Sequence, residues 1–406
     1  MSASSSGNSY RVLDLFAGAG GFSLGFDWAG FSTSVAIDFN QNAIDTLVGN
    51  YSDKKTVVLK EDLSKLTPFQ LEHKLSKENI RINFDVIIGG PPCQGWSMAG
   101  RGKIRSLTKD SGPQGPLEDP RNKLYKRYLA YVRHFQPKVA VMENVSGMLS
   151  HSGINIADLV AETFEDAGYR VTWKKVNASE FGVPQSRERL FFVGIRKDLN
   201  LQFRFPETIL KNGQFKYPTA TVKDAISDLP AITHGSKDWI KNYIKQTGTS
   251  DYAKLMRKDA VPGKIFDHVC RGHNEQDLAA FKHMKQGDLY KDLPAHLKRY
   301  RDDIFHDKYR KLRWSKPSGC VTAHLSKDCY SHIHPSQTRT ISVREAARLQ
   351  SFPDSFYFAG SMSSKFQLIG NAVPPLVAFR IATEIKKQIF SIQRKSKATS
   401  FQEVEL

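Results

Sequence analysis

The residues of this chain best suited to chemistry are Pro91-Pro92-Cys93-Gln94. They follow an apolar run from Phe84 to Gly90 that predicts a buried parallel strand ending in a glycine turn. Open α/β sheets bind their ligands at the carboxyl ends of the strands, where Cys93 would lie. Because two prolines stiffen the backbone before it, the thiol of Cys93 is a candidate nucleophile. The alternative is a small buried hydrophobic side chain, which is a frequent role of free cysteine.

A second group of residues could hold a nucleotide-like cofactor. Phe16-Ala-Gly18-Ala-Gly20-Gly21 follows an apolar strand and opens a helix, so its backbone can approach a negative group closely. By itself, this turn could be only a tight connection. The next two strands end near Asp38 and Asp62, which suit a ribose diol and an adenine amino group, respectively. Together these residues predict a cofactor that contains adenosine.

Acidic and basic side chains follow at two later strand ends. Glu143-Asn144-Val145 closes the strand that begins at Val139, and Gln185-Ser-Arg187-Glu-Arg189 precedes another strand. We expect both to face the crevice that Cys93 occupies. The alternatives are that Glu143 only caps the following segment and that Arg187 and Arg189 form a solvated pair.

The elements that would position these residues alternate between strands and helices. Strands are predicted at 11–16, 33–37, 57–59, 85–88, 139–142, 171–176 and 190–195, and helices at 22–29, 41–50, 124–135, 154–167, 343–349 and 377–389. This alternation predicts an α/β fold with a doubly wound, mostly parallel sheet. Residues 206–340 show weak periodicity, and we predict a second, smaller domain there without assigning its elements.

The charge of the chain indicates a polyanionic partner. Its 406 residues include 59 Lys and Arg against 41 Asp and Glu, a net charge of +18. Residues 121–138 carry six of these cations and no acid, shortly after Cys93. The alternative is a basic surface that only favours solubility.

The cysteine content and the hydropathy indicate a compartment. Four cysteines are too few and too scattered for a disulfide framework or a Cys-x-x-Cys metal site. No apolar run approaches the roughly 18 residues of a membrane span. Residues 1–9 form a polar lead with no secretory signal. We therefore interpret the protein as cytoplasmic, without a membrane or metal partner.

Seven ordered motifs resemble those of DNA (cytosine-5) methyltransferases of the bacterial restriction-modification type. They are Asp14-Leu-Phe-Ala-Gly-Ala-Gly-Gly21, Gly90-Pro-Pro-Cys-Gln94, Asp119-Pro-Arg-Asn-Lys-Leu124, Glu143-Asn-Val145, Gln185-Ser-Arg-Glu-Arg189, Arg344-Glu-Ala-Ala-Arg-Leu-Gln-Ser-Phe-Pro353 and Gly370-Asn-Ala-Val-Pro-Pro375. The resemblance covers about residues 10–204 and 312–392.

This resemblance implies a fold and a division into domains. It implies the Rossmann-like fold of S-adenosylmethionine-dependent methyltransferases for a catalytic, cofactor-binding domain at 10–204 plus 357–394. A small, irregular target-recognition domain for DNA would occupy 205–356. Residues 1–9 would be a disordered lead, and 395–406 would be a tail.

The resemblance also implies the reaction and the roles of the site residues. Cys93 would add to C6 of a flipped-out cytosine, and Glu143 would hydrogen-bond N3 and the exocyclic amine. Arg187 would donate to O2, and Arg189 completes the catalytic set. S-adenosylmethionine would supply the methyl group and leave as S-adenosylhomocysteine. Its contacts would come from Phe16, Gly18, Gly20, Asp38 and Asp62, with Pro92, Leu124 and Asn371 at matching positions.

The implied partner is double-stranded DNA, bound by a monomer. A cognate restriction endonuclease would act separately.

The loop from Gln94 to Leu117 has five glycines and several cations, so we expect a lid over the site. An alternative substrate is tRNA, but those enzymes carry a Cys-Phe-Thr element where this chain reads Ser318-Gly-Cys-Val-Thr-Ala-His324. A catalytically inactive DNA-binding regulator would have lost the nucleophile, the carboxyl or the arginine, and all three are present.

Overall fold

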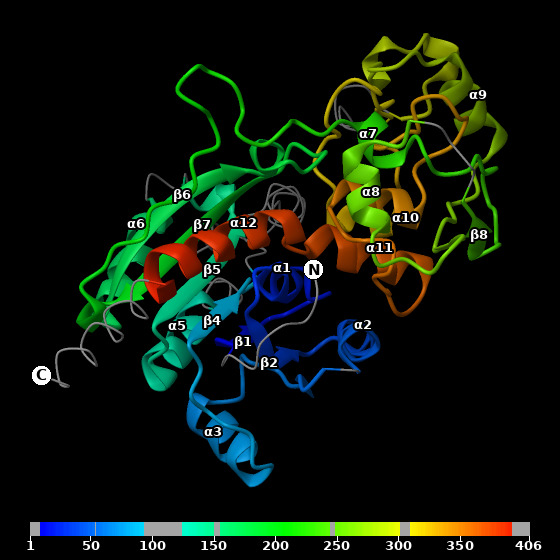
Figure 1. Cartoon of the computed structure of the whole chain (residues 1–406). Coiled ribbons are helices and arrows are strands. Elements are labelled where there is room, and N and C mark those ends of the chain that lie inside the picture. The colour runs from blue at the N-terminus through cyan, green and yellow to red at the C-terminus, as the bar shows by residue number, and fades with distance from the viewer. Residues whose placement is uncertain are drawn as a thin grey trace, which may run out of the picture. The chain divides into compact units, whose positions relative to one another are not determined.

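A computed structural model describes residues 9–52, 54–92, 124–149, 155–243, 248–300 and 309–391. The chain divides into two compact units (Figure 1). Unit 1 comprises Met1–Val176, Glu188–Glu207 and Ala378–Leu406, and unit 2 comprises Asn177–Arg187 and Thr208–Val377. Each unit is therefore assembled from segments that lie far apart in the sequence.

Unit 1 is built on a seven-stranded sheet with the strand order β3-β2-β1-β4-β5-β7-β6. The strands are β1 (Arg11–Leu15), β2 (Ser32–Asp38), β3 (Val57–Lys60), β4 (Val86–Gly89), β5 (Val139–Val145), β6 (Tyr169–Asn177) and β7 (Glu188–Arg196). β1 to β5 are parallel, whereas β7 runs antiparallel to β5. The carboxyl ends of the five parallel strands and the start of β7 therefore meet at one edge. The predicted α/β class with a mostly parallel sheet is confirmed.

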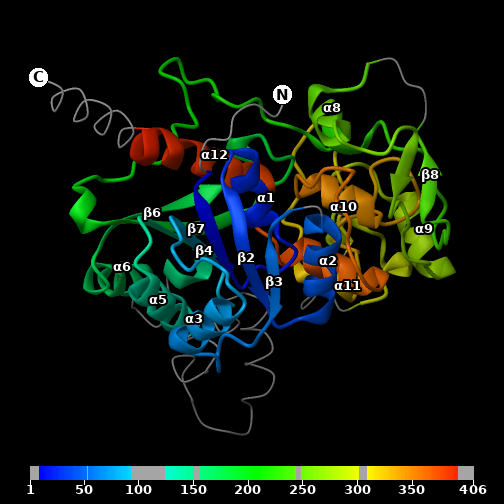
Figure 2. The ribbon, with the colours of Figure 1, turned by 60° about the horizontal axis from the view of Figure 1, so that its bottom comes forward.

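Helices cover both faces of this sheet, because alternate residues of each strand point to opposite faces. They are α1 (Gly21–Trp28), α2 (Gln41–Tyr51), α3 (Pro68–Lys77), α5 (Leu124–Phe135), α6 (Ile156–Asp166) and most of α12 (Pro375–Ile385), which continues as a π-helix, Lys386–Phe390. Short 3₁₀ turns lie at Ser146–Leu149 and Lys197–Leu199. Figure 2 shows α5 and α6 on one side of the strands and α1 on the other. All of these helices were predicted except α3, which begins at a capping box formed by Thr67 and Gln70.

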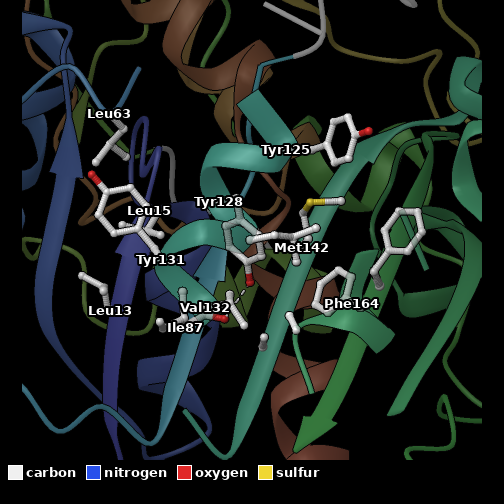
Figure 3. Close-up of a cluster of buried hydrophobic side chains, with 14 of the residues drawn as sticks. Leu13, Leu15, Leu63, Ile87, Tyr125, Tyr128, Tyr131, Val132, Met142 and Phe164 are labelled. Atoms are coloured by element: carbon white, nitrogen blue, oxygen red, sulfur yellow. Dashed lines mark hydrogen bonds between the residues drawn. The ribbon is translucent and has the colours of Figure 1, made fainter. Parts of the chain in front are cut away.

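The core between the sheet and α3, α5 and α6 fixes the position of the carboxyl end of β4 relative to β1 and α5. Tyr128 of α5 is fully buried, and its hydroxyl donates to the carbonyl of Ile87 in β4 at 3.0 Å (Figure 3). A Cβ atom at Gly89 would lie 2.6 Å from the carbonyl oxygen of Leu15 and 3.0 Å from the Tyr128 ring. Only glycine therefore allows β1, β4 and α5 to pack this closely where β4 ends.

Unit 2 consists of short elements. They are a 3₁₀ turn at Ala178–Phe181, α7 (Val222–Ile226), β8 (Ile240–Asn242), α8 (Asp251–Arg257), β9 (Lys264–Phe266), α9 (Glu275–His283), 3₁₀ turns at Tyr290–Asp292, Ala295–Leu297 and Ala323–Ser326, α10 (Val343–Leu349) and α11 (Met362–Asn371). β8 and β9 form a two-stranded antiparallel ribbon.

The interior of unit 2 contains paired charges, which explains its weak hydrophobic periodicity. Arg348 is fully buried and contacts Asp228 at 2.5 Å and Asp354 at 2.6 Å. Arg339 is 1% exposed and pairs with Glu345 at 2.7 Å. Buried charges of this kind need partners, and here the partners come from several segments of the chain.

The observed units differ from the predicted domains at three places. We placed boundaries after residues 204 and 356, whereas residues 177–187 and 357–377 belong to unit 2 and the first boundary falls after Glu207. The reason for the second difference is α11, because a Cβ atom at Gly370 would lie 2.2 Å from the backbone of Thr322. α11 therefore packs directly on unit 2. Residues 1–8 of the predicted lead and the predicted tail, 395–406, lie outside the described residues.

One stretch, Met362–Phe390, has the length and the composition to cross a membrane, and 72% of its most apolar window is buried inside the protein. The helix is interrupted between Asn371 and Pro375, so α11 and α12 are separate helices. Each is shorter than the roughly 20 residues of a membrane-spanning helix. The burial of this stretch fits core helices.

Candidate active site at the carboxyl edge of the sheet

The turn after β1 adopts left-handed backbone conformations at three residues. Phe16, Gly18 and Gly20 have φ angles of 60°, 55° and 83°. A Cβ atom at Gly20 would lie 2.7 Å from Leu47 of α2, so this position requires glycine for packing as well as for its φ angle. A positive φ is unusual for a bulky residue such as Phe16, and such strain concentrates at functional sites.

Asp38 holds this glycine turn in place. One oxygen of its carboxylate accepts from the backbone N–H of Gly18 and the other from that of Asn40, each at 2.8 Å. The side chain is nearly buried, and burial raises its pKa. Each oxygen keeps a further lone pair, so Asp38 can still accept from a ligand hydroxyl.

Asp14 lies behind the turn and is not exposed to a ligand. It is 1% exposed, and the Ser23 hydroxyl donates to it at 2.5 Å. Burial raises the pKa of Asp14 to about 7, because an ionised carboxylate is poorly solvated there.

The end of β3 carries Asp62, whose side chain is 44% exposed. One of its carboxylate oxygens accepts from the Ser64 hydroxyl at 2.6 Å, and this hydrogen bond lowers the pKa of Asp62. Phe39 is 61% exposed directly after Asp38, and our sequence reasoning missed it. An aromatic residue immediately after an acid at a strand end was the available signal, because such a ring can stack on a base.

The chain that leads to Cys93 is fixed on the neighbouring strand. Gly90, Pro91 and Pro92 follow β4, and the Asn144 amide donates to the carbonyl of Pro91 at 3.1 Å. A Cβ atom at Gly90 would lie 3.4 Å from a carboxylate oxygen of Glu143. The Pro-Pro segment therefore lies beside Glu143. Cys93 itself and the predicted lid, 94–117, lie outside the described residues.

Glu143 is paired with Arg189. Glu143 lies in β5, Arg189 lies in β7, and their side chains meet diagonally across this antiparallel pair, with 3.0 Å between Nε and the carboxylate. The two side chains are 11% and 18% exposed, so this ion pair is only partly shielded from solvent. A carboxyl and a guanidinium are thus presented together at the edge where Pro91 and Pro92 lie.

Arg187 belongs to unit 2, where its guanidinium is bound to main-chain carbonyls. It is 2% exposed and donates to the carbonyls of Val321 at 2.7 Å, Gly370 at 3.1 Å and Ala372 at 3.2 Å. Gln185 supports the same region by donating to the carbonyl of Leu349 at 3.1 Å. These contacts join the segment before β7 to α10 and α11.

The structure brings most of the predicted site residues together at one edge of the unit 1 sheet. These are Phe16, Gly18, Gly20, Asp38, Asp62, Pro92, Glu143 and Arg189, with Leu124 as the partly buried first residue of α5. Arg187 and Asn371, the exposed last residue of α11, belong to unit 2. Sequence reasoning also gave no role to Asn144, although it lies inside a quoted motif.

No group of three or more His, Cys, Asp or Glu side chains among the described residues could hold a metal ion. His268 of unit 2 is held by hydrogen bonds within the protein. Its two ring nitrogens lie 2.8 Å from the Ser342 hydroxyl and 2.8 Å from the carbonyl of Pro230, so both are used in packing.

The sheet order and the cofactor-like turn define the fold of S-adenosylmethionine-dependent methyltransferases. The sequence profile of the C-5 cytosine-specific DNA methylases matches residues 10–387. The chain belongs to this family, and the predicted enzyme class, a DNA cytosine-5 methyltransferase, is confirmed.

Relatives and solved structures agree with this placement. The type II methyltransferase M1.HphI of Haemophilus parahaemolyticus is 37% identical, over 93% of this chain and 87% of its own. M.DdeI of Desulfomicrobium norvegicum is 34% identical, over 92% and 88%. A crystal structure described as a prophage-encoded DNA modification methyltransferase of E. coli matches 94% of this chain and 99% of its own, with a TM-score of 0.72 and 28% identity. S. pombe Dnmt2 shares the fold, with a TM-score of 0.55 and 16% identity.

Proposed function

We propose that this protein methylates C5 of a cytosine within a particular DNA sequence, through a covalent bond between Cys93 and C6 of the base. The observation that supports the proposal is the Glu143–Arg189 pair beside Pro91 and Pro92, the residues that lead directly into Cys93. The type II methyltransferase relatives support a role in protecting DNA in a restriction-modification system, beside a separate endonuclease. We propose that the enzyme acts as a monomer.

The reaction requires a nucleophile because cytosine C5 does not take a methyl group unaided. The Cys93 thiolate adds to C6, which pushes electron density to C5 and negative charge onto N3 and O2. Glu143 donates a proton at N3 and accepts from the exocyclic amine, and Arg189 donates to O2. After methyl transfer, loss of the C5 proton expels the Cys93 thiolate and restores the aromatic ring.

This proposal divides the roles of the two arginines differently from our first expectation. We predicted that Arg187 donates to O2 of the base. Its terminal N–H groups already donate to three main-chain carbonyls, whereas Arg189 contacts the catalytic carboxyl. We therefore assign the base-facing role to Arg189 and a positioning role to Arg187.

The residues at the strand ends fit S-adenosylmethionine, which supplies the methyl group when it is bound. The left-handed turn with Phe16, Gly18 and Gly20 leaves room for the methionine end. We assign Asp38 to the ribose, and Asp62 and the exposed ring of Phe39 to adenine; the exposure of Phe39 and Asp62 supports this assignment. Pro92, Leu124 and Asn371 complete the proposed set.

The target base must leave the helical stack before Cys93 can reach it, which costs a few kcal/mol. We propose that unit 2 recognises the DNA sequence. Binding energy from phosphate and base contacts would offset the cost of unstacking.

The experiment that tests the proposal uses purified protein, labelled S-adenosylmethionine, and duplex DNA and tRNA at equal concentration. We expect label in duplex DNA, no label with Cys93→Ser, and a loss of about 10²-fold or more with Glu143→Gln at retained DNA affinity. Preferential labelling of tRNA, or full activity of the serine variant, would overturn it.

A second readout detects the covalent bond itself. A duplex with 5-fluorocytosine at the target position cannot lose a proton from C5, so the adduct should persist and survive denaturing electrophoresis. We expect a stable complex with the parent protein and none with Cys93→Ser. Methylation without any trapped complex would refute the covalent step and leave the methyltransferase assignment standing.

A further inference from the structure

Unit 2 contains a hollow of about 580 Å³ whose wall comes from four separate parts of the chain, 235–239, 270–273, 327–330 and Met362. The lining includes Lys237, Trp239, Arg271, Lys327 and Asp328, together with Cys270 and Cys329. All of them belong to unit 2, so the hollow is complete within this unit.

The charge of the wall favours an anion. Lys237, Arg271 and Lys327 contribute three cations, against one carboxylate from Asp328. Lys237 and Lys327 are exposed, and neither ammonium forms an ion pair within the part of the chain that the structure describes. Exposed lysines without acidic partners are suited to phosphate contact.

Arg271 shapes the wall and is not free to follow a ligand. Its guanidinium donates to the carbonyls of Leu325 at 3.3 Å and Ser326 at 2.6 Å, and to the Ser363 hydroxyl at 3.1 Å. It thereby holds the 3₁₀ turn at Ala323–Ser326, directly before Lys327, against α11. Arg271 therefore fixes the backbone that leads into Lys327.

The floor of the hollow is unsuited to a metal ion or to covalent chemistry. Cys270 and Cys329 line it, and each is 1% exposed. Burial raises the pKa of Cys270 to about 11 and that of Cys329 to about 12, so both thiols stay protonated at neutral pH. The residues of the hollow that are suited to bind a ligand are therefore its cations, Lys237, Arg271 and Lys327.

A two-stranded ribbon continues from the mouth of the hollow. Trp239 is 40% exposed and immediately precedes β8, and the ammonium of Lys365 lies 4.8 Å from its ring centre. Ile240 and Phe266 form an exposed cross-strand pair on the ribbon, at 55% and 36% exposure. A ribbon of this kind fits the major groove of duplex DNA, where apolar side chains can contact thymine methyl groups.

We propose that the hollow and the β8–β9 ribbon form one DNA-contact surface of unit 2, in which Lys237 and Lys327 bind phosphates and the ribbon enters the major groove. The proposal rests on the proposed function, because it takes duplex DNA as the substrate. Charge complementarity favours DNA over a second protein, since Lys237 and Lys327, which form no ion pair among the described residues, lie in the same unit as the exposed apolar pair.

The test compares Lys237→Ala/Lys327→Ala with a matched control, Lys282→Ala/Lys291→Ala, which removes two exposed lysines elsewhere in unit 2. Binding of a fluorescein-labelled duplex is measured by anisotropy over a range of salt concentrations, without S-adenosylmethionine. We expect the hollow variant to bind roughly tenfold more weakly and its salt slope to fall by about 2, because each lost phosphate contact removes about 0.9. The control should keep the affinity and slope of the parent.

Further measurements separate this inference from the proposed function. Methyl transfer by the control variant, Lys282→Ala/Lys291→Ala, should stay near the parental rate, because neither lysine lies at the hollow or on the ribbon. Equal affinities and salt slopes of the two double variants would overturn the inference while the parent still methylates DNA. Weakened binding of a mononucleotide with unchanged duplex binding would also overturn it, since the hollow would then be a small-ligand site. A parent protein that neither binds nor methylates duplex DNA would refute the proposed function itself.

Discussion

The two arginines that precede and begin β7 should fail in opposite ways when each is replaced by alanine. Arg187→Ala removes the donor to the carbonyls of Val321, Gly370 and Ala372. The carbonyl of Ala372 keeps a second donor, the amide of Gln350 at 2.6 Å, so the cost falls on the carbonyls of Val321 and Gly370. At about 1–3 kcal/mol for each unsatisfied group, the expected loss of unfolding free energy is about 4 kcal/mol.

Arg189→Ala should affect the reaction more than the stability. Its ion pair with Glu143 is partly exposed, so the expected loss of stability is about 1 kcal/mol. The rate should fall by about 10²-fold or more, because the variant loses a donor to the charge that develops on the base.

Two measurements distinguish these outcomes. Thermal unfolding should show a midpoint about 10 °C lower for Arg187→Ala, since 1 kcal/mol corresponds to about 2–4 °C in a unit of this size. Single-turnover methyl transfer at saturating DNA and S-adenosylmethionine, at a temperature where both variants are folded, should show the larger defect for Arg189→Ala. A stable Arg187→Ala protein with the larger rate defect would refute our division of roles.

Three further predictions concern unit 1. Burial raises the pKa of Asp14 to about 7 from 3.8, so its contribution to stability is complete below about pH 4 and is lost as the pH rises through about 7. Between low and high pH, this loss can reach about 4 kcal/mol of unfolding free energy, and urea unfolding of Asp14→Asn should not show it. If the stability of Asp14→Asn declined with pH as much as that of the parent, the assignment would be contradicted. Gly89→Ala should cost about 3 kcal/mol because its Cβ atom would meet the Leu15 carbonyl at 2.6 Å. Gly18→Ala, with φ 55° and open space, should cost only about 1 kcal/mol, and the reverse order in urea midpoints would refute the packing argument. Tyr128→Phe should lose about 1 kcal/mol with its hydrogen bond to Ile87, and an unchanged urea midpoint would show that this bond contributes little.

Much of unit 1 could be predicted because its signals are local. Apolar runs of four to nine residues, separated by amphipathic helices, predict a parallel sheet, and parallel strands bring their carboxyl ends to one edge. That rule alone places Asp38, Asp62 and Glu143 on the same side of the protein. The family motifs then indicate what chemistry this edge carries.

Unit 2 could not be predicted in the same way because its interior depends on partners far apart in the sequence. Arginine is ordinarily a surface residue, and Arg348 is buried only because Asp228 and Asp354 meet it in the fold. The hollow beside Trp239 likewise forms from separate segments that extend from Gly235 to Met362, so no short window of sequence contains it.

The sequence by itself determined the class of the fold, the edge of the sheet that carries the site and the family to which the chain belongs, because these depend on local patterns and ordered motifs. The tertiary structure decided where the site residues lie. Arg187 and Arg189 are two residues apart, a spacing that would place both on one face of a strand. Because Arg187 precedes β7 and meets carbonyls from residues 321, 370 and 372, it is held in unit 2, whereas Arg189 lies beside Glu143.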